Sequence, residues 1–98
     1  MSLNLTTTTL ERGIIAEIVD RALDTVITRY SRQDLVMAIT ACHLNGTRLD
    51  LPKLRAARGV DFVHDVTGIA HHLDRRTGQL TGGFVPRCAW TAAEGEGG

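Results

Sequence analysis

The sequence predicts a small α+β domain that is mainly α-helical, with helices first and a β-hairpin near the C-terminus. Apolar residues recur at helical spacing in the first third of the chain. Capping residues stand where further helices would begin, and an alternating segment interrupted by "DRRTG" follows them. We expect one globular domain over residues 9–90, a flexible N-terminus over 1–8 and a disordered tail over 91–98.

The first helix is predicted over residues 9–29. Thr8 and Glu11 have the spacing of a capping box, in which each side chain bonds the backbone of the other residue. A wide apolar stripe follows, and its width suggests that this helix also forms a homodimer contact. The stripe consists of Leu10, Ile14, Ile15, Ile18, Val19, Ala22, Leu23, Val26 and Ile27.

Two further helices are predicted over residues 32–44 and 51–58. Ser31 is suited to cap the first of these, and Asn45-Gly46 supplies a stop signal at its end. Asp50 is suited to cap the second, in which Pro52 is tolerated because it lies in the first turn.

A fourth, short helix is predicted over residues 61–67, with Asp61 as its cap and Gly68 as its stop. The alternative is a helix that continues through Ile69 to Leu73, because positions 62, 66, 69 and 73 share one helical face. We favour the stop at Gly68, since the next residues alternate as a strand does. The hairpin then comprises strands over 69–74 and 79–85, joined by a turn that Asp74 and Gly78 would form.

Composition limits the classes of function. Eleven basic residues balance eleven acidic ones, which disfavours a protein held mainly by nucleic-acid phosphates. Two cysteines are too few for a disulfide scaffold and favour a reducing cytoplasm. No apolar run approaches the ~20 residues that cross a membrane, and no secretory signal is visible.

Histidines suggest a metal site, but their spacing argues against it. His64, His71, His72 and Cys88 include no C-x₂-C, H-x₃₋₅-H or H-E-x-x-H pattern. Adjacent histidines on a strand point to opposite faces. We therefore expect no metal and no cofactor. The alternative is a metal-dependent or nucleic-acid-directed enzyme that uses His64, Asp65 and His72.

The sequence also gives only weak signals for a catalytic site or a nucleic-acid-binding site. No serine or cysteine stands in a nucleophile motif, and Cys42 fits a core position. A basic cluster at Arg48, Lys53, Arg55 and Arg58 suits a solvated helix face better than a nucleic-acid groove.

Residues 49–87 resemble a family of small uncharacterised bacteriophage and prophage proteins. The resemblance is carried by "DF-x-HD-x-x-GI", "H-L-DR-x-TG-x-L" and "FVPR", which begin here at Asp61, His72 and Phe84. Gly83 departs from the pattern, where a larger residue is expected. The resemblance implies a phage origin and a bacterial host cytoplasm, and it implies no activity.

We therefore expect a non-enzymatic phage accessory protein that binds a host or phage macromolecule, with inhibition of a host-defence complex as one version. A protein partner is favoured over nucleic acid. The expected contact residues lie on the hairpin and just after it: His71, His72, Arg75, Arg76 and Arg87.

Overall fold

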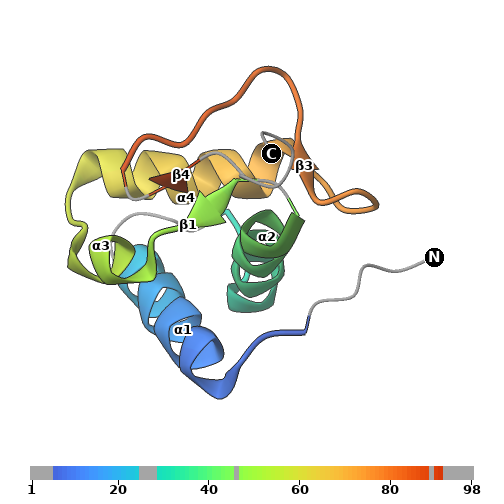
Figure 1. Cartoon of the computed structure of the whole chain (residues 1–98). Coiled ribbons are helices and arrows are strands. Elements are labelled where there is room, and N and C mark those ends of the chain that lie inside the picture. Colours follow the sequence, from blue (N-terminus) through green and yellow to red (C-terminus); the bar gives the residue numbers. More distant parts are fainter. Residues whose placement is uncertain (1–5, 25–28, 46, 89, 92–98) are drawn as a thin grey trace.

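The computed structural model describes residues 6–24, 29–45, 47–88 and 90–91 (Figure 1). It confirms the mainly helical α+β class. The helices are α1 (Thr9–Leu23), α2 (Arg32–Asn45), α3 (Leu51–Ala56) and α4 (Val60–His72). The strands are β1 (Arg48–Leu49), β2 (Leu73–Asp74), β3 (Gln79–Leu80) and β4 (Trp90–Thr91). None of the helices in these residues has the length and apolar character that a membrane-spanning helix needs.

Helix α2 lies at the centre of the fold, where it packs against both α1 and α4. The short helix α3 packs against α1 and precedes α4 in the chain (Figure 1). Side chains of α1, α2 and α4 fill the space between these helices with apolar atoms. Leu54 of α3 completes this core, whose largest fully buried apolar residues are Ile15, Ile18, Leu35, Ile39, Leu54 and Ile69.

Helix α1 begins as predicted and ends early. The Thr8 hydroxyl accepts a hydrogen bond from the Glu11 amide at 3.0 Å, and the Glu11 carboxylate accepts one from the Thr8 amide at 2.8 Å. The helix stops at Leu23, so the predicted end at residue 29 is wrong. Asp24 follows as the C-cap, and the four residues after it, "TVIT", carry β-branched side chains that disfavour a helix. They lie outside the described residues.

Helices α2 and α3 also begin at their predicted caps. The Ser31 hydroxyl accepts from the Asp34 amide at 3.1 Å, and the Asp50 carboxylate accepts from the Lys53 amide at 3.3 Å. Helix α3 ends at Ala56, two residues before the predicted end. At this end the Leu54 carbonyl accepts hydrogen bonds from the Ala57 amide at 3.1 Å and from Nη2 of Arg21 at 2.9 Å, which satisfies a carbonyl of the last turn.

Helix α4 contradicts the predicted stop at Gly68 and confirms the alternative of a continuous helix. Its N-cap is Gly59 and not the predicted Asp61, and the helix runs unbroken to His72. Gly68 instead permits a tertiary contact with Phe84. A Cβ atom at this position would lie 2.0 Å from Cζ of Phe84, so the missing side chain makes room for that ring.

The hairpin has the predicted turn but much shorter strands than 69–74 and 79–85. Leu73 pairs with Leu80 and Asp74 with Gln79, while Ile69 to His72 are helical. The Asp74 carboxylate accepts from the Arg76 amide at 2.9 Å, and Gly78 has φ +77°.

A second two-stranded pair, β1 with β4, was not predicted and joins Arg48 to Thr91. Thr91 therefore belongs to a strand, although it was expected to begin the disordered tail. The rest of that tail, 92–98, lies outside the described residues, as do 1–5 of the predicted flexible N-terminus.

Candidate functional site

The most distinctive surface feature is the segment between β3 and β4, which runs back along α4 (Figure 1). We call it the C-terminal strap and define it as residues 81–88 together with Trp90. It has no regular secondary structure over residues 84–88. Side-chain contacts with α4 therefore determine its path.

Asp65 of α4 is the central fastening point of the strap. The residue is 1% exposed, and Oδ2 accepts hydrogen bonds from the Arg87 amide at 2.9 Å, the Cys88 amide at 2.7 Å and the Trp90 indole at 3.0 Å. Bonds to an ionised acceptor are stronger than neutral ones. Three donors of the strap, from Arg87, Cys88 and Trp90, thus converge on one buried oxygen. Oδ1 is buried and has no partner within the described residues.

Phe84 fixes the other end of the strap. Its ring occupies the space beside Gly68 and stacks on His72, with ring centroids 5.2 Å apart and an interplanar angle of 12°. The His64 ring lies 5.9 Å from the same ring. The His72 carbonyl accepts from the amide and the hydroxyl of Thr81, both at 2.8 Å. The strap is therefore anchored at the middle of α4 by Asp65 and toward the C-terminal end of α4 by Gly68 and His72.

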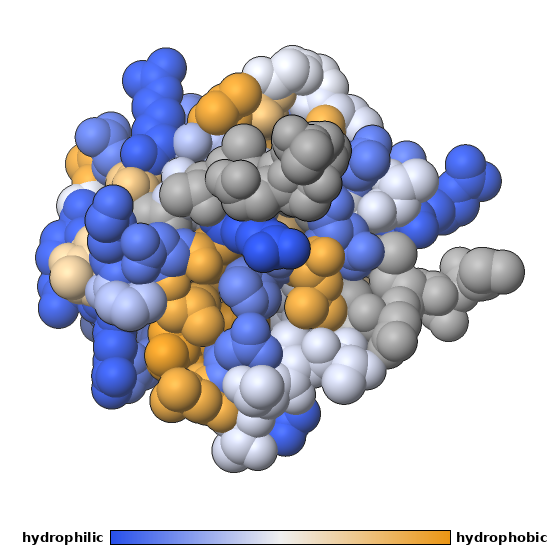
Figure 2. Space-filling view, viewed as in Figure 1, coloured by the Kyte–Doolittle hydropathy of each residue, from blue (hydrophilic) through white to orange (hydrophobic). Residues whose placement is uncertain are grey.

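Strap side chains alternate between the helix and the solvent. Phe84 is half-buried and Pro86 is buried, whereas Val85 is 70% exposed and Arg87 is exposed. Figure 2 shows an apolar protrusion on the upper edge of the molecule, over the path that the strap takes in Figure 1. The strap thus presents an apolar and a cationic side chain on a fixed backbone.

The five predicted contact residues do not form one cluster. His71 and His72 end α4, and their rings meet edge to face with centroids 4.8 Å apart. They lie on a helix, so the prediction that they alternate on a strand is wrong. Arg75 and Arg76 lie in the hairpin turn, where Arg75 approaches Asp34 at 3.8 Å. Of the five, only Arg87 belongs to the strap. His72 contacts the strap from α4, because its ring stacks on Phe84.

The alternative metal set of His64, Asp65 and His72 is not assembled into a site. His64 and His72 are eight residues apart on one helix, which is roughly 12 Å along its axis. Asp65 directs Oδ2 at strap donors. Among the described residues, no group of three or more histidine, cysteine or acidic side chains has the geometry to hold a metal ion.

The structure reveals a carboxylate–imidazole pair that sequence reasoning missed. Nε2 of His43 lies 2.9 Å from the Glu11 carboxylate, and Nδ1 accepts from the Leu49 amide at 3.2 Å. Nε2 must then carry the proton that it shares with Glu11. Hydrogen bonds from the Thr8 amide and from His43 lower the pKa of Glu11. The partners are 32 residues apart, so no local signal marks them.

This pair is closed to nucleophilic catalysis, because the nitrogen that would take a proton already binds a backbone amide. Cys42, the residue before His43, is buried in the core, as predicted. Its thiol donates to the Thr47 carbonyl at 3.2 Å, and burial raises its pKa to about 11. Cys42 and Cys88 are both free thiols.

The comparisons with known proteins give one match. The sequence profile of a family of unknown function, DUF6874, matches residues 10–90. The match extends from α1 to the first residue of β4, and it therefore includes the strap and its anchors on α4. No curated protein matches the chain, and no solved structure does.

Proposed function

The chain belongs to DUF6874, a family of unknown function, and we propose that it acts by binding a protein partner through the outward face of the C-terminal strap. Val85 and Arg87 are the contact residues in this proposal, with the exposed His64 at the margin of the surface. The activity is binding, without a catalytic step.

One observation carries the proposal: a non-regular segment is held rigidly while it exposes a large apolar side chain. Loops on a rigid scaffold are common binding elements because their backbone needs no ordering when a partner binds. The bonds to Asp65 and the Phe84 contact at Gly68 supply that order here. Val85 stands between two residues that face α4, so its exposure does not follow from a mobile backbone.

The chemistry of the strap indicates the kind of partner. An isolated apolar side chain is suited to fill a shallow apolar depression, and arginine is enriched at protein interfaces because it bonds carboxylates in a bidentate manner. The expected partner surface is therefore an apolar depression with a carboxylate at its rim. Such a contact is small and fits a transient complex.

The resemblance to small phage and prophage proteins gives this proposal a setting. In it, the protein acts in the bacterial host cytoplasm on a host or phage macromolecule, and inhibition of a defence complex is one form of such action. A homodimer through α1 remains part of the proposal at lower priority. Most of the apolar stripe of α1 is buried in its own core, but Leu10 is 69% exposed and Figure 2 shows apolar surface over α1.

The test uses two valines with similar exposure. Val85 on the strap and Val60 at the start of α4 are 70% and 82% exposed. Immobilised wild-type protein, Val85→Asp and Val60→Asp are each incubated with lysate of the organism that carries the gene. Bound proteins are quantified by mass spectrometry. We expect at least one protein that wild type and Val60→Asp retain and Val85→Asp loses.

Arg87→Glu should lose the same protein, because it reverses the charge that faces the carboxylate rim. Thermal melting of each variant checks that the fold is kept. If Val60→Asp removes the captured protein and Val85→Asp retains it, the strap is not the contact surface and the proposal fails.

A further inference from the structure

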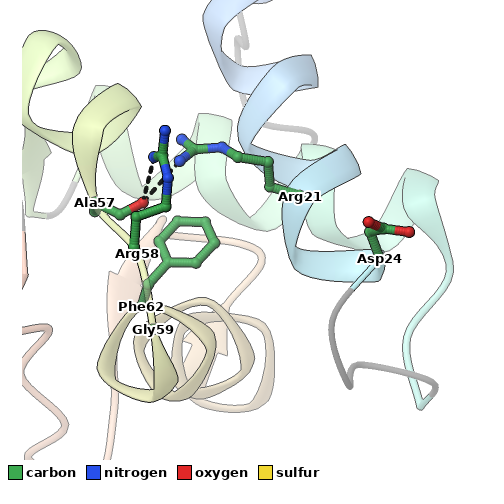
Figure 3. Close-up of a pocket in the computed structure, with 6 residues that line it drawn as sticks. All are labelled: Arg21, Asp24, Ala57, Arg58, Gly59 and Phe62. Atoms are coloured by element: carbon green, nitrogen blue, oxygen red, sulfur yellow. Dashed lines mark hydrogen bonds between the residues drawn. The ribbon is translucent and has the colours of Figure 1, made fainter.

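Helix α4, which carries the strap, is fastened to the rest of the fold at its N-terminal end by Arg21 of α1. Figure 3 shows this side chain reaching from α1 toward Ala57 and Phe62. Its guanidinium group donates to the Ala57 carbonyl at 2.7 Å and to the Leu54 carbonyl at 2.9 Å. The same group lies over the Phe62 ring, 5.1 Å from the ring centroid. The support of the strap is therefore fixed to both α1 and α3 at this end.

The outer side of the strap leaves a side chain and a peptide group without partners. The Arg87 guanidinium group is exposed and makes no hydrogen bond or ion pair with any residue that the structure describes. The amide and the carbonyl of Val85 likewise have no hydrogen-bond partner in the described part of the chain. Free amide and carbonyl groups can pair with an extended segment of another protein. The strap thus offers a cation and a backbone pairing site two residues apart.

The inner side of the strap holds the peptide bond between Arg87 and Cys88 in place. Oδ2 of Asp65 accepts from the amide of Arg87 at 2.9 Å and from the amide of Cys88 at 2.7 Å. Pro86, just before this bond, is buried, and the Trp90 indole beyond it donates to the same oxygen at 3.0 Å. Both ends of the chain would therefore stay on α4 if this one bond were cut.

We propose that the strap binds in the active-site cleft of a trypsin-like serine endoprotease and inhibits it. This inference rests on the proposed function, because it names the kind of protein that the strap contacts. Such a protease reads arginine in a specificity pocket that contains a carboxylate. That pocket suits the Arg87 guanidinium group, which has no anion of its own in the described part of the chain. The peptide group of Val85 pairs with the backbone of the enzyme, as extended peptides do in such clefts.

The hold of Asp65 on the strap explains why the complex is inhibited. The serine hydroxyl of the enzyme attacks the carbonyl carbon of Arg87, and the bond from this carbon to the Cys88 nitrogen breaks. The serine proton passes through the enzyme's histidine to that nitrogen, which becomes an amine, and Arg87 is left as an ester of the serine. In an ordinary substrate the amine departs and water hydrolyses the ester. Here Asp65 and the Trp90 anchor keep the amine beside the ester, so the peptide bond re-forms.

The experiment uses trypsin as the probe and follows its hydrolysis of a chromogenic arginine anilide while the full chain is added. We expect competitive inhibition, and Arg87→Gln should weaken it at least about thirtyfold because the charge in the specificity pocket loses its partner. The matched control is Arg76→Gln, which removes the same charge from the hairpin turn. It should change the inhibition constant less than about twofold.

A second measurement tests the hold on the cut bond. Wild type and Asp65→Asn are incubated with trypsin, and mass spectrometry follows cleavage between Arg87 and Cys88. Asp65→Asn weakens both amide contacts, so this bond should be cut at least about tenfold faster than in wild type. Thermal melting shows whether each variant is folded. The comparison also keeps the inference testable if Arg87→Gln unfolds.

Three results overturn the inference. They are no inhibition at about 100 μM chain, equal weakening by Arg87→Gln and Arg76→Gln, and equally fast cleavage of wild type and Asp65→Asn. The lysate experiment separates this failure from that of the proposed function. If trypsin is not inhibited but capture from lysate still depends on Val85, the strap binds a protein of another kind. Capture that does not depend on Val85 contradicts the proposed function instead.

Discussion

Replacing Asp65 by alanine should release the C-terminal strap from α4. The substitution removes the acceptor of three hydrogen bonds and leaves the Cys88 amide and the Trp90 indole beside an apolar methyl group. Asp65 is 1% exposed, so water reaches the site poorly while the fold is intact. The strap must either move away from α4 or keep unpaired donors.

The size of the effect follows from the number and type of bonds lost. A hydrogen bond to a charged group contributes about 1.5–3 kcal/mol to stability. The three bonds share one oxygen and Arg87 is exposed, so their contributions do not add fully. Breaking a buried charged network costs about 3–5 kcal/mol, which we expect for Asp65→Ala. A domain of this size has about 5–15 kcal/mol in total, so the variant loses a large part of its stability.

The assay is urea unfolding followed by tryptophan fluorescence, and Trp90 is the only tryptophan in the chain. Emission of folded Asp65→Ala should shift to longer wavelength, because the indole is released to water. Amide hydrogen exchange at Arg87 and Cys88 should also become faster. Asp65→Asn keeps one acceptor oxygen, so it should lose only about 1–2 kcal/mol.

Asp61→Ala is the matched control, since Asp61 is exposed and lies one turn earlier on α4. We expect it to cost less than about 1 kcal/mol, the value of an acid near a helix start. If Asp65→Ala is as stable as Asp61→Ala and its Trp90 emission is unchanged, Asp65 does not fasten the strap.

Three further predictions concern other contacts. Gly68→Ala should destabilise the protein by about 1–3 kcal/mol, because the new methyl group displaces Phe84. Gly13→Ala should instead stabilise α1 by up to about 1 kcal/mol, because nothing lies within 4 Å of a Cβ atom at that position. Chemical unfolding measures both variants, and stabilisation by both would contradict the Phe84 contact. The pKa of Glu11 is lowered from its ordinary value of 4.5, so its contribution to stability is complete above that pH and is lost as the pH falls through the lower, folded value. Unfolding free energies from pH 6 to 3 should therefore fall more steeply for wild type than for Glu11→Gln, and parallel curves would refute this. Burial raises the pKa of the Cys42 and Cys88 thiols to about 11, so both should react slowly with iodoacetamide at pH 8, and Asp65→Ala should accelerate only Cys88.

Elements with local signals were predictable from the sequence. The Thr8–Glu11 capping box, the Asp50 cap and the Asp74 turn each depend on residues within a few positions of one another. Such bonds form in the same way in most surroundings, so a pattern of residue types is sufficient to find them. The class of fold and the starts of α1, α2 and α3 follow from these signals and from the Ser31 cap.

Elements that depend on distant contacts were not predictable. Gly68 has the properties of a helix stop, but Phe84, sixteen residues later, decides that it lies inside a helix. The β1–β4 pair joins residues more than forty positions apart, and two-residue strands have no periodicity to detect. His43 and Glu11 meet for the same kind of reason, across α1 and α2.

The dipeptide His64-Asp65 shows how this limit affects a functional interpretation. In sequence, the two residues suggest a shared metal site. In the structure they lie on different sides of α4: His64 is exposed, while Asp65 is buried and binds the strap. Adjacent residues on a helix point in directions about 100° apart, so adjacency alone cannot place them in one site.

The strap residues can be divided by what the fold requires of them. Phe84 needs the space at Gly68, Pro86 is buried, and Trp90 bonds Asp65. The fold uses only the backbone amide of Arg87, so its side chain is not needed for this contact. Burying Val85 would be favourable by roughly 1.5–3 kcal/mol, yet the strap holds it in water. Since the Asp65 and Gly68 contacts account for the strap's path, the exposure of Val85 and Arg87 agrees with the proposed contact with a protein partner.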